Sequence, residues 1–241
     1  SDARFFFDED RKVSLESWVE SLKAVVYQQK LGTSYEKMER FKALAGQLAD
    51  QLNPSIKEQA LRTAFLCKAD LVTGMVGEFP EVQGIMGREY ALHDGEPQEV
   101  ANAIAEHYYP TQAGGKLPGS DIAAFVSIAD KLDTICGCFS VGLIPTGAAD
   151  PYALRRATIG IISIIQDKGY KLSLSGLIDS SLALLADKLT RPAETVKAEL
   201  MEFFRGRFVN LLSAIRQTDV VEACVAAGFD DLADCTIRVQ A

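Results

Sequence analysis

The chain has 241 residues, of which 48% are hydrophobic and 24% charged, a composition typical of a globular protein with a substantial core. Its net charge of −8 excludes a surface that binds nucleic acid over most of its area, so any RNA contact is confined to a few Arg and Lys residues or completed by a partner. No apolar run reaches the ~20 residues of a membrane span and the first residues lack signal-peptide features, so we expect a soluble intracellular chain.

Helical periodicity extends over most of the chain. The spacing of apolar residues predicts helices over residues 14–31, 34–52 and 55–76, with Gly32 and Asn53-Pro54 as stops. Two more are predicted over residues 97–108 and 120–139. After Pro151 helices recur through ATIGIISIIQD, SLALLADKL, PAETVKAELMEFFRGRFVNLL and DVVEACVAAG. IGIISII is rich in β-branched residues, but its flanks favour a buried helix. The predicted fold class is all-α.

Glycine and proline interrupt this pattern in three places. Residues 77–96 and 109–119 are predicted to be long irregular loops, which in a compact domain are usually functional or docked against something. The segment GLIPTGAADP, residues 142–151, is the clearest boundary between helical blocks. We therefore predict a helical domain over residues 1–150 and a second helical segment over residues 151–241.

Common catalytic and metal motifs are not indicated. The five cysteines are an odd number in mostly apolar segments, which argues against a disulfide framework, and Cys136-Gly-Cys138 lacks the second pair of a zinc site. Neither His93 nor His107 lies near a nucleophile motif. His93-Asp94 matches the metal-binding doublet of a phosphohydrolase superfamily, but it lies in a polar turn and not on a buried helix.

Three predicted helices nevertheless resemble that HD superfamily with its ligands replaced. In this resemblance Lys37 stands at the position of the first histidine, Ala69 and Asp70 at the doublet, and Asp130 at the final aspartate. Two carboxylates and a lysine cannot rebuild the metal site. We therefore expect no metal, and we expect Asp70 and Asp130 to lie close together in the core. An ammonium group, from Lys37 or Lys68, is expected to form an ion pair there in place of the metal.

Longer motifs resemble a more specific family. They are DARFFFDED, KADLVTGMVGEFPEVQGIMGREYA, EHYYPTQAGGKLP and ADKLDTICGCFSVGLIPTGAADPYALRR. Together they resemble the β subunit of the bacterial-type, two-subunit glycyl-tRNA synthetase, over most of the chain and most strongly over residues 1–160. One departure is visible: residues 113–117 read AGGKL, so Gly115 stands where the family usually has an acid.

The resemblance implies a cytoplasmic α2β2 enzyme that charges tRNA-Gly with glycine at the expense of ATP. The α subunit would hold the aminoacylation site together with ATP and magnesium. This chain would be an internal fragment of the β subunit that contributes to tRNA recognition or assembly, with no catalytic residue and no cofactor of its own. The implied partners are the α subunit and tRNA-Gly, and neither a membrane nor DNA.

Five residues are candidates for RNA contact: Arg155, Arg156, Lys116, Arg88 and Tyr108. The first two open a helix after PTGAADP, where the helix dipole disfavours paired cations unless an anion is near. Tyr108, beside a glycine-rich loop, could stack on an unpaired base. Each candidate could instead be an ordinary surface or half-buried residue, and one arginine could pair with Asp150 to pin the turn. Two other functions stay open: a purely structural interaction domain, and an HD-type metal phosphohydrolase, which the missing histidines disfavour.

Overall fold

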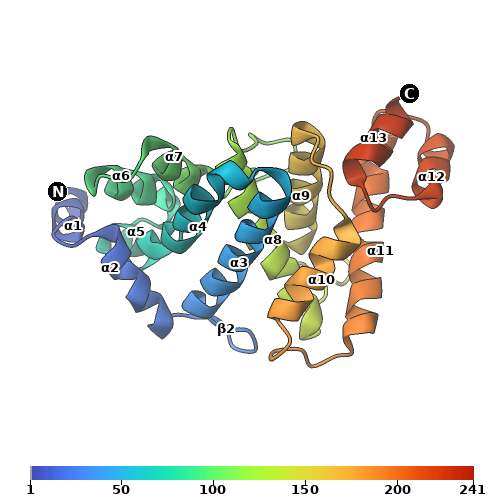
Figure 1. Ribbon diagram of the computed structural model, residues 1–241. Coiled ribbons are helices and arrows are strands. Elements are labelled where there is room, and N and C mark those ends of the chain that lie inside the picture. Colours follow the sequence, from blue (N-terminus) through green and yellow to red (C-terminus); the bar gives the residue numbers. More distant parts are fainter. Residues whose placement is uncertain (1) are drawn as a thin grey trace. The chain divides into compact units, whose positions relative to one another are not determined.

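The computed structural model describes residues 2–241, which are mainly helical (Figure 1). These residues form thirteen α-helices, four short 3₁₀ helices and one two-stranded antiparallel hairpin. The all-α prediction is therefore confirmed. Among the described helices, none is both long and apolar enough to pass through a bilayer.

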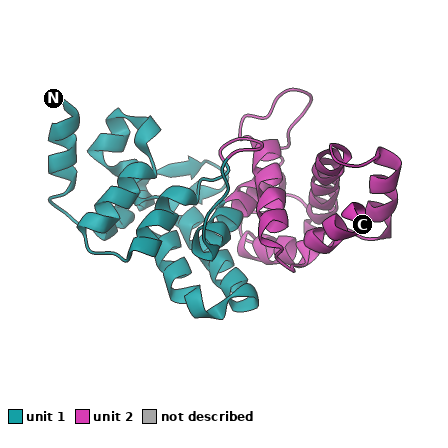
Figure 2. Cartoon of the chain, turned by 90° about the horizontal axis from the view of Figure 1, so that it is seen from above, with its two compact units in different colours: residues 1–110, 116–130 teal, residues 111–115, 131–241 magenta. Residues whose placement is uncertain are grey.

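The chain divides into two compact units (Figure 2). Unit 1 comprises Ser1–Pro110 and Lys116–Asp130, and unit 2 comprises Thr111–Gly115 and Lys131–Ala241. The division falls inside one helix, α8 (Asp121–Ser140), earlier than the glycine- and proline-rich stretch at residues 142–151. The proposed domains, residues 1–150 and 151–241, therefore stay a prediction.

Unit 1 is a bundle in which α3 packs on α4, α4 on α7, α6 on α7, and α1 on α5. Its helices are α1 (Asp2–Asp10), α2 (Leu15–Val19), η1 (Glu20–Ala24), α3 (Ser34–Leu52), η2 (Pro54–Ile56), α4 (Lys57–Leu66), η3 (Ala69–Val72), α5 (Gly74–Glu78), η4 (Pro80–Val82), α6 (Ile85–His93), α7 (Gln98–Glu106) and the first half of α8. The hairpin pairs β1 (Val26–Gln28) with β2 (Gly32–Thr33).

Two predicted helices of unit 1 are interrupted. The helix expected over residues 14–31 gives way to the hairpin, in which Gly32, with a φ of 94°, begins β2 and pairs with Gln28 instead of ending a helix. The helix expected over residues 55–76 ends at Leu66 and restarts at Gly74. The restart is stabilised by Asp10, whose carboxylate accepts hydrogen bonds from the backbone N–H groups of Gly74 (2.8 Å) and Met75 (2.9 Å).

Unit 2 contains the rest of α8 and five further helices: α9 (Leu154–Lys168), α10 (Leu174–Leu184), α11 (Ala193–Ser213), α12 (Thr218–Ala227) and α13 (Leu232–Gln240). Helix α11 packs on α9, α10 and α12, and α13 packs on α9 and α12. The β-branched run IGIISII lies inside α9, so the choice of helix over strand is confirmed. Its isoleucines are mostly buried, and Gly169 ends the helix in the left-handed conformation.

Candidate functional site

Asp130, on α8, is the centre of a buried group of charged side chains in unit 1. The ammonium nitrogen of Lys68 lies 2.8 Å from Oδ2 of Asp130, and that of Lys37 lies 3.3 Å from Oδ1. Nε2 of His107, which is fully buried, lies 3.9 Å from Oδ2. We call Lys37, Lys68, His107 and Asp130 the Asp130 cluster. The side chains of this cluster are at most 13% exposed.

Electrostatics keep the carboxylate of this cluster ionised. Burial by itself would raise the pKa of Asp130, but the neighbouring ammonium groups of Lys68 and Lys37 outweigh burial and hold that pKa well below its ordinary value. Burial would likewise lower the pKa of Lys68, but Asp130 raises it above its ordinary value. The pair is therefore charged at neutral pH.

Aromatic rings cover the two ammonium groups. The nitrogen of Lys37 lies 4.7 Å from the centre of the Tyr27 ring, and that of Lys68 lies 4.3 Å from the centre of the Tyr108 ring. These cation–π contacts replace part of the water that the ammonium groups lose on burial. The ion pair expected of Lys37 or Lys68 is thus confirmed at Asp130, and both lysines take part.

The residues do not suit a divalent cation. Ammonium groups lie against both oxygens of Asp130, and an ammonium nitrogen has no lone pair for a metal. Ala69, at the position of a ligand in the HD resemblance, is buried in η3. Within residues 2–241 no three His, Cys, Asp or Glu side chains are grouped so that they could hold a metal ion. The descent of this site from an HD metal centre stays a prediction.

Asp70 has a separate structural role beside the cluster. Its Oδ2 accepts hydrogen bonds from the backbone N–H groups of Gly84 (2.6 Å) and Gly87 (3.0 Å), at the start of α6. Burial raises the pKa of its carboxyl above the ordinary value, although these hydrogen bonds oppose the shift. The ring of Tyr108 lies against Lys68, the partner of Asp130, and also close to Gly84, whose N–H binds Asp70, so the two aspartates lie in one neighbourhood. The two aspartates nevertheless have different partners: Asp130 has lysines and Asp70 has backbone N–H groups.

The glycines of the QGIMG segment fit tightly around Asp70. Gly84 has a φ of 80°, and a Cβ atom there would lie 2.9 Å from the ring of Tyr108. A Cβ atom on Gly87 would lie 2.8 Å from the side chain of Ile104 and 3.1 Å from Oδ2 of Asp70. The prediction of an irregular loop over residues 77–96 is therefore wrong in part. Helix α6, which Asp70 caps, spans Ile85–His93 within that range.

The turn before α9 places the paired arginines in unit 2. The carboxylate of Asp150 accepts hydrogen bonds from the backbone N–H groups of Leu154 (2.8 Å) and Arg155 (3.0 Å). The guanidinium of Arg155 donates to the carbonyl of Gly147 at 2.7 Å. The guanidinium of Arg155 thus pins the turn through a carbonyl, and only the backbone N–H of this residue binds the Asp150 carboxylate. Arg156 is exposed.

The other RNA-contact candidates lie in unit 1. Arg88 forms an ion pair with Glu89 at 3.2 Å, and the exposed Lys116 has its ammonium 5.8 Å from the centre of the Tyr109 ring. The ring of Tyr108 already lies against the ammonium of Lys68 and fills the space that a Cβ atom on Gly84 would need. The structure tests none of these as RNA contacts, so they stay predictions.

Two features of this region were not predicted from the sequence. His107, considered there only as a hydrolase base, faces Asp130 from the end of α7. Gly84 and Gly87 had no predicted role. A polar partner for His107 could have been predicted from the sequence, because a lone imidazole beside a buried apolar helix needs one.

The conformation of residues 112–115 explains the departure at Gly115. Its backbone N–H donates to the carbonyl of Gln112 at 3.0 Å, and a Cβ atom would lie 2.9 Å from that oxygen. A side chain at this position therefore requires a different turn.

Comparison with known proteins identifies the family. The family described as "Glycyl-tRNA synthetase beta subunit" matches residues 1–226. The chain belongs to this family. Relatives named "Glycine--tRNA ligase beta subunit" come from Trichlorobacter lovleyi (80% identical), Geobacter sulfurreducens (72%) and Geobacter metallireducens (71%). Each match covers all 241 residues of this chain and 35% of the relative. The chain therefore spans about a third of the length of these β subunits.

Proposed function

We propose that this chain is part of the β subunit of an α2β2 glycine–tRNA ligase and serves tRNA recognition or assembly. The complete enzyme would join glycine to tRNA-Gly with ATP in the cytoplasm, with glycine, ATP and magnesium bound on the α subunit. The observation that carries this proposal is the family match over residues 1–226. The chain would supply no catalytic group or cofactor, and its partners would be the α subunit and tRNA-Gly.

The Asp130 cluster supports binding or scaffolding over hydrolysis. A phosphohydrolase would need metal-bound water as its nucleophile, and the lysines hold both oxygens of the carboxylate that would bind the metal. Cys67, the adjacent thiol, is fully buried, and burial raises its pKa well above the ordinary value, which disfavours the nucleophilic thiolate. The cluster is therefore best explained as a stabilising element of the bundle.

Arg156 is the residue that we favour for a phosphate contact. It is exposed at the start of α9, and the neighbouring turn is held by Asp150 and Arg155. The carboxylate of Asp150 already occupies the N-terminus of α9, so the phosphate contact would depend on the guanidinium of Arg156, which offers a charge with fixed donors. A pinned turn lowers the entropy that such a contact would cost. Arg155, which is bound to Gly147, is then a positioning residue.

A kinetic experiment in the complete enzyme tests this proposal. The T. lovleyi β subunit, with its matched stretch replaced by these 241 residues, would be assembled with its α subunit; we call this the chimeric enzyme. We expect Arg156→Glu to lower kcat/KM for tRNA-Gly about tenfold, equivalent to ~1.4 kcal/mol. The KM values for glycine and ATP should not change, because both would bind the other subunit.

The exposed Lys30, on the hairpin turn of unit 1, gives a matched charge-reversal control. Lys30→Glu should leave all three kinetic parameters unchanged. Arg156→Glu with unchanged kcat/KM for tRNA-Gly and an unchanged melting temperature would favour the purely structural alternative. Tightly bound metal, together with phosphatase activity in the purified chain, would favour the phosphohydrolase.

A further inference from the structure

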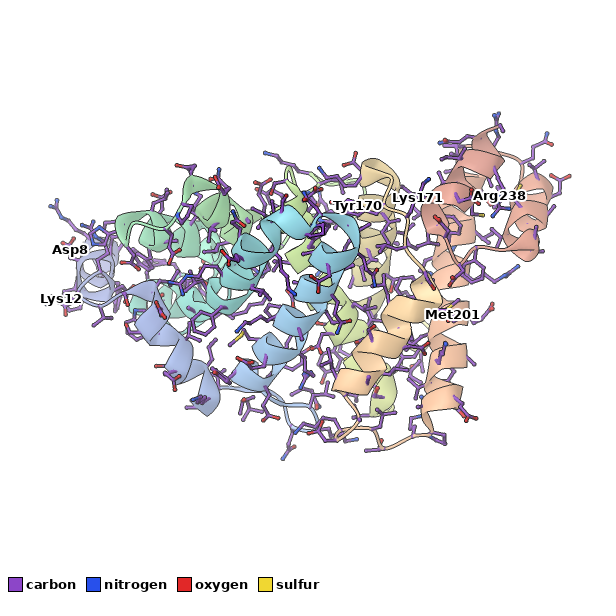
Figure 3. The ribbon with its side chains drawn as sticks, viewed as in Figure 1. Asp8, Lys12, Tyr170, Lys171, Met201 and Arg238 are labelled. Atoms are coloured by element: carbon purple, nitrogen blue, oxygen red, sulfur yellow. The ribbon has the colours of Figure 1, made fainter. Side chains whose placement is uncertain are left out.

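One end of unit 2 exposes several large apolar side chains. Ile237, on α13, is 65% exposed, Ile215, after α11, is 56% exposed, and Val220, on α12, is 43% exposed. Single exposed apolar residues are normal, whereas a cluster of them usually marks a binding surface. Figure 3 shows the side chains of this end, with Lys171 and Arg238 labelled.

Two grooves meet at Ile215. The first has a volume of about 560 Å³ and is lined by Leu211, Leu212, Ile215 and Ile237, among other residues of α9, α11 and α13. The second, of about 760 Å³, is lined by Ile215 and Val220 together with polar residues such as Arg216 and Gln217. Ile215 lines both grooves and so connects their apolar side chains. We call Leu211, Ile215, Val220 and Ile237 the α11–α13 patch.

Four charged side chains around the patch are bound within unit 2, whereas the hydroxyl of Ser213, which lines the second groove, has no hydrogen-bond partner among the described residues. Asp231 caps α13 by accepting a hydrogen bond from the N–H of Asp234 (2.9 Å), and Asp234 forms an ion pair with Arg238 (2.9 Å). Arg216 donates to the carbonyls of Val239 (3.2 Å) and Gln240 (2.6 Å). These groups therefore have little to offer a polar ligand. The apolar side chains are left as the recognising surface, with the exposed Lys171 on the wall of the first groove.

We propose that the α11–α13 patch docks an apolar helix from elsewhere in the same β-subunit polypeptide. The T. lovleyi relative has 65% of its length outside the matched stretch, since the match covers 35% of it. A helix with apolar residues at i, i+3 or i+4, and i+7 fits a shallow apolar groove, and an acidic residue on its flank would pair with Lys171. This inference depends on membership of the family and not on the proposed contact with tRNA.

Affinity favours an occupant in the same chain over a separate protein. Stable complexes between separate proteins usually bury about 1,200–2,000 Å², and a patch of four apolar side chains supplies only a small part of that area. A tethered segment is present at an effective concentration of about 1 mM or more, so weak apolar contacts suffice to hold it. A second copy of the chain, or the α subunit, would lack this advantage.

Hydrogen exchange tests the proposal in the chimeric β subunit. We expect the amides of residues 211–217 and 232–240 to exchange about tenfold more slowly in the chimeric β subunit than in the isolated chain, which corresponds to ~1.4 kcal/mol. Ile215→Asp combined with Ile237→Asp should abolish that difference. Ile237→Ser alone should reduce the difference in exchange. This single variant provides the test if the double variant fails to fold. The matched control is Val26→Asp, since Val26 is 67% exposed on the hairpin of unit 1.

Three results would overturn the proposal. The first is equal exchange in the isolated chain and the chimeric β subunit. The second is a dimer of the isolated chain that Ile237→Asp dissociates, which would assign the patch to a second copy. The third is protection that appears only when the α subunit is added. None of these results depends on tRNA, so failure here is distinguishable from failure of the proposed function.

Discussion

At the scale of single residues, Lys68 illustrates how the bundle tolerates a buried charge. Its ammonium is held between the carboxylate of Asp130 at 2.8 Å and the ring of Tyr108 at 4.3 Å. Lys68→Met would leave Asp130 with one lysine in a buried site. We expect it to lower the free energy of unfolding by about 3 kcal/mol, measured by urea denaturation. Lys30→Met, at an exposed site, should change it by less than about 0.5 kcal/mol. A loss below about 1 kcal/mol for Lys68→Met would contradict this role.

The depressed pKa of Asp130 has a consequence for stability at low pH. A carboxyl whose pKa is lower in the folded state than in the unfolded state stabilises the folded state fully when the pH is above the unfolded-state pKa, which is about 3.9. This contribution to stability is lost as the pH falls below that value. Asp130→Asn should therefore be less stable than the wild type at pH 7. The difference between the two should shrink below about pH 4. Thermal unfolding followed from pH 7 to pH 3 measures it, and a difference that shrinks as the pH rises would have the wrong sign.

At the scale of elements, periodicity predicted most helices because apolar spacing fixes the buried face. It could not predict where α5 and α6 start, because these N-termini bind side chains that are distant in the sequence. Asp10 caps α5 from 64 residues away, and Asp70 caps α6 through Gly84 and Gly87. The lysine partner of Asp130 could be predicted, since a buried carboxylate needs a cation. The partners of Asp70 and Arg155 are backbone groups. These groups are the same in nearly every residue, so the sequence does not identify them.

Gly87 provides the test at this scale. A methyl group there would collide with Ile104 at 2.8 Å and approach Asp70, so Gly87→Ala should cost about 1–3 kcal/mol in the free energy of unfolding. Gly77, in α5, has no atom within 4 Å of an added Cβ. Gly77→Ala should be neutral or stabilise the protein by up to about 1 kcal/mol, because alanine favours a helix. Equal effects of the two substitutions would show that packing around Asp70 does not matter.

At the scale of the whole molecule, membership of the β-subunit family and the geometry of the Asp130 cluster both favour a binding or structural role over metal-dependent hydrolysis. The ion pairs and cation–π contacts replace what a metal would supply to the bundle. Dialysis against a chelator should therefore leave the melting temperature of the isolated chain unchanged, within about 1 °C. A large fall that is restored by a divalent cation would show that a metal stabilises the fold.

We propose above all that the chain serves the ligase by contacting tRNA, with Arg156 as a phosphate contact. Equilibrium binding of tRNA-Gly to the chimeric enzyme across a series of salt concentrations tests it most directly. Arg156→Glu should weaken binding and reduce the slope of log affinity against log salt by about one unit, while Lys30→Glu leaves both unchanged. A folded Arg156→Glu enzyme with the affinity and salt slope of the wild type would contradict the claim.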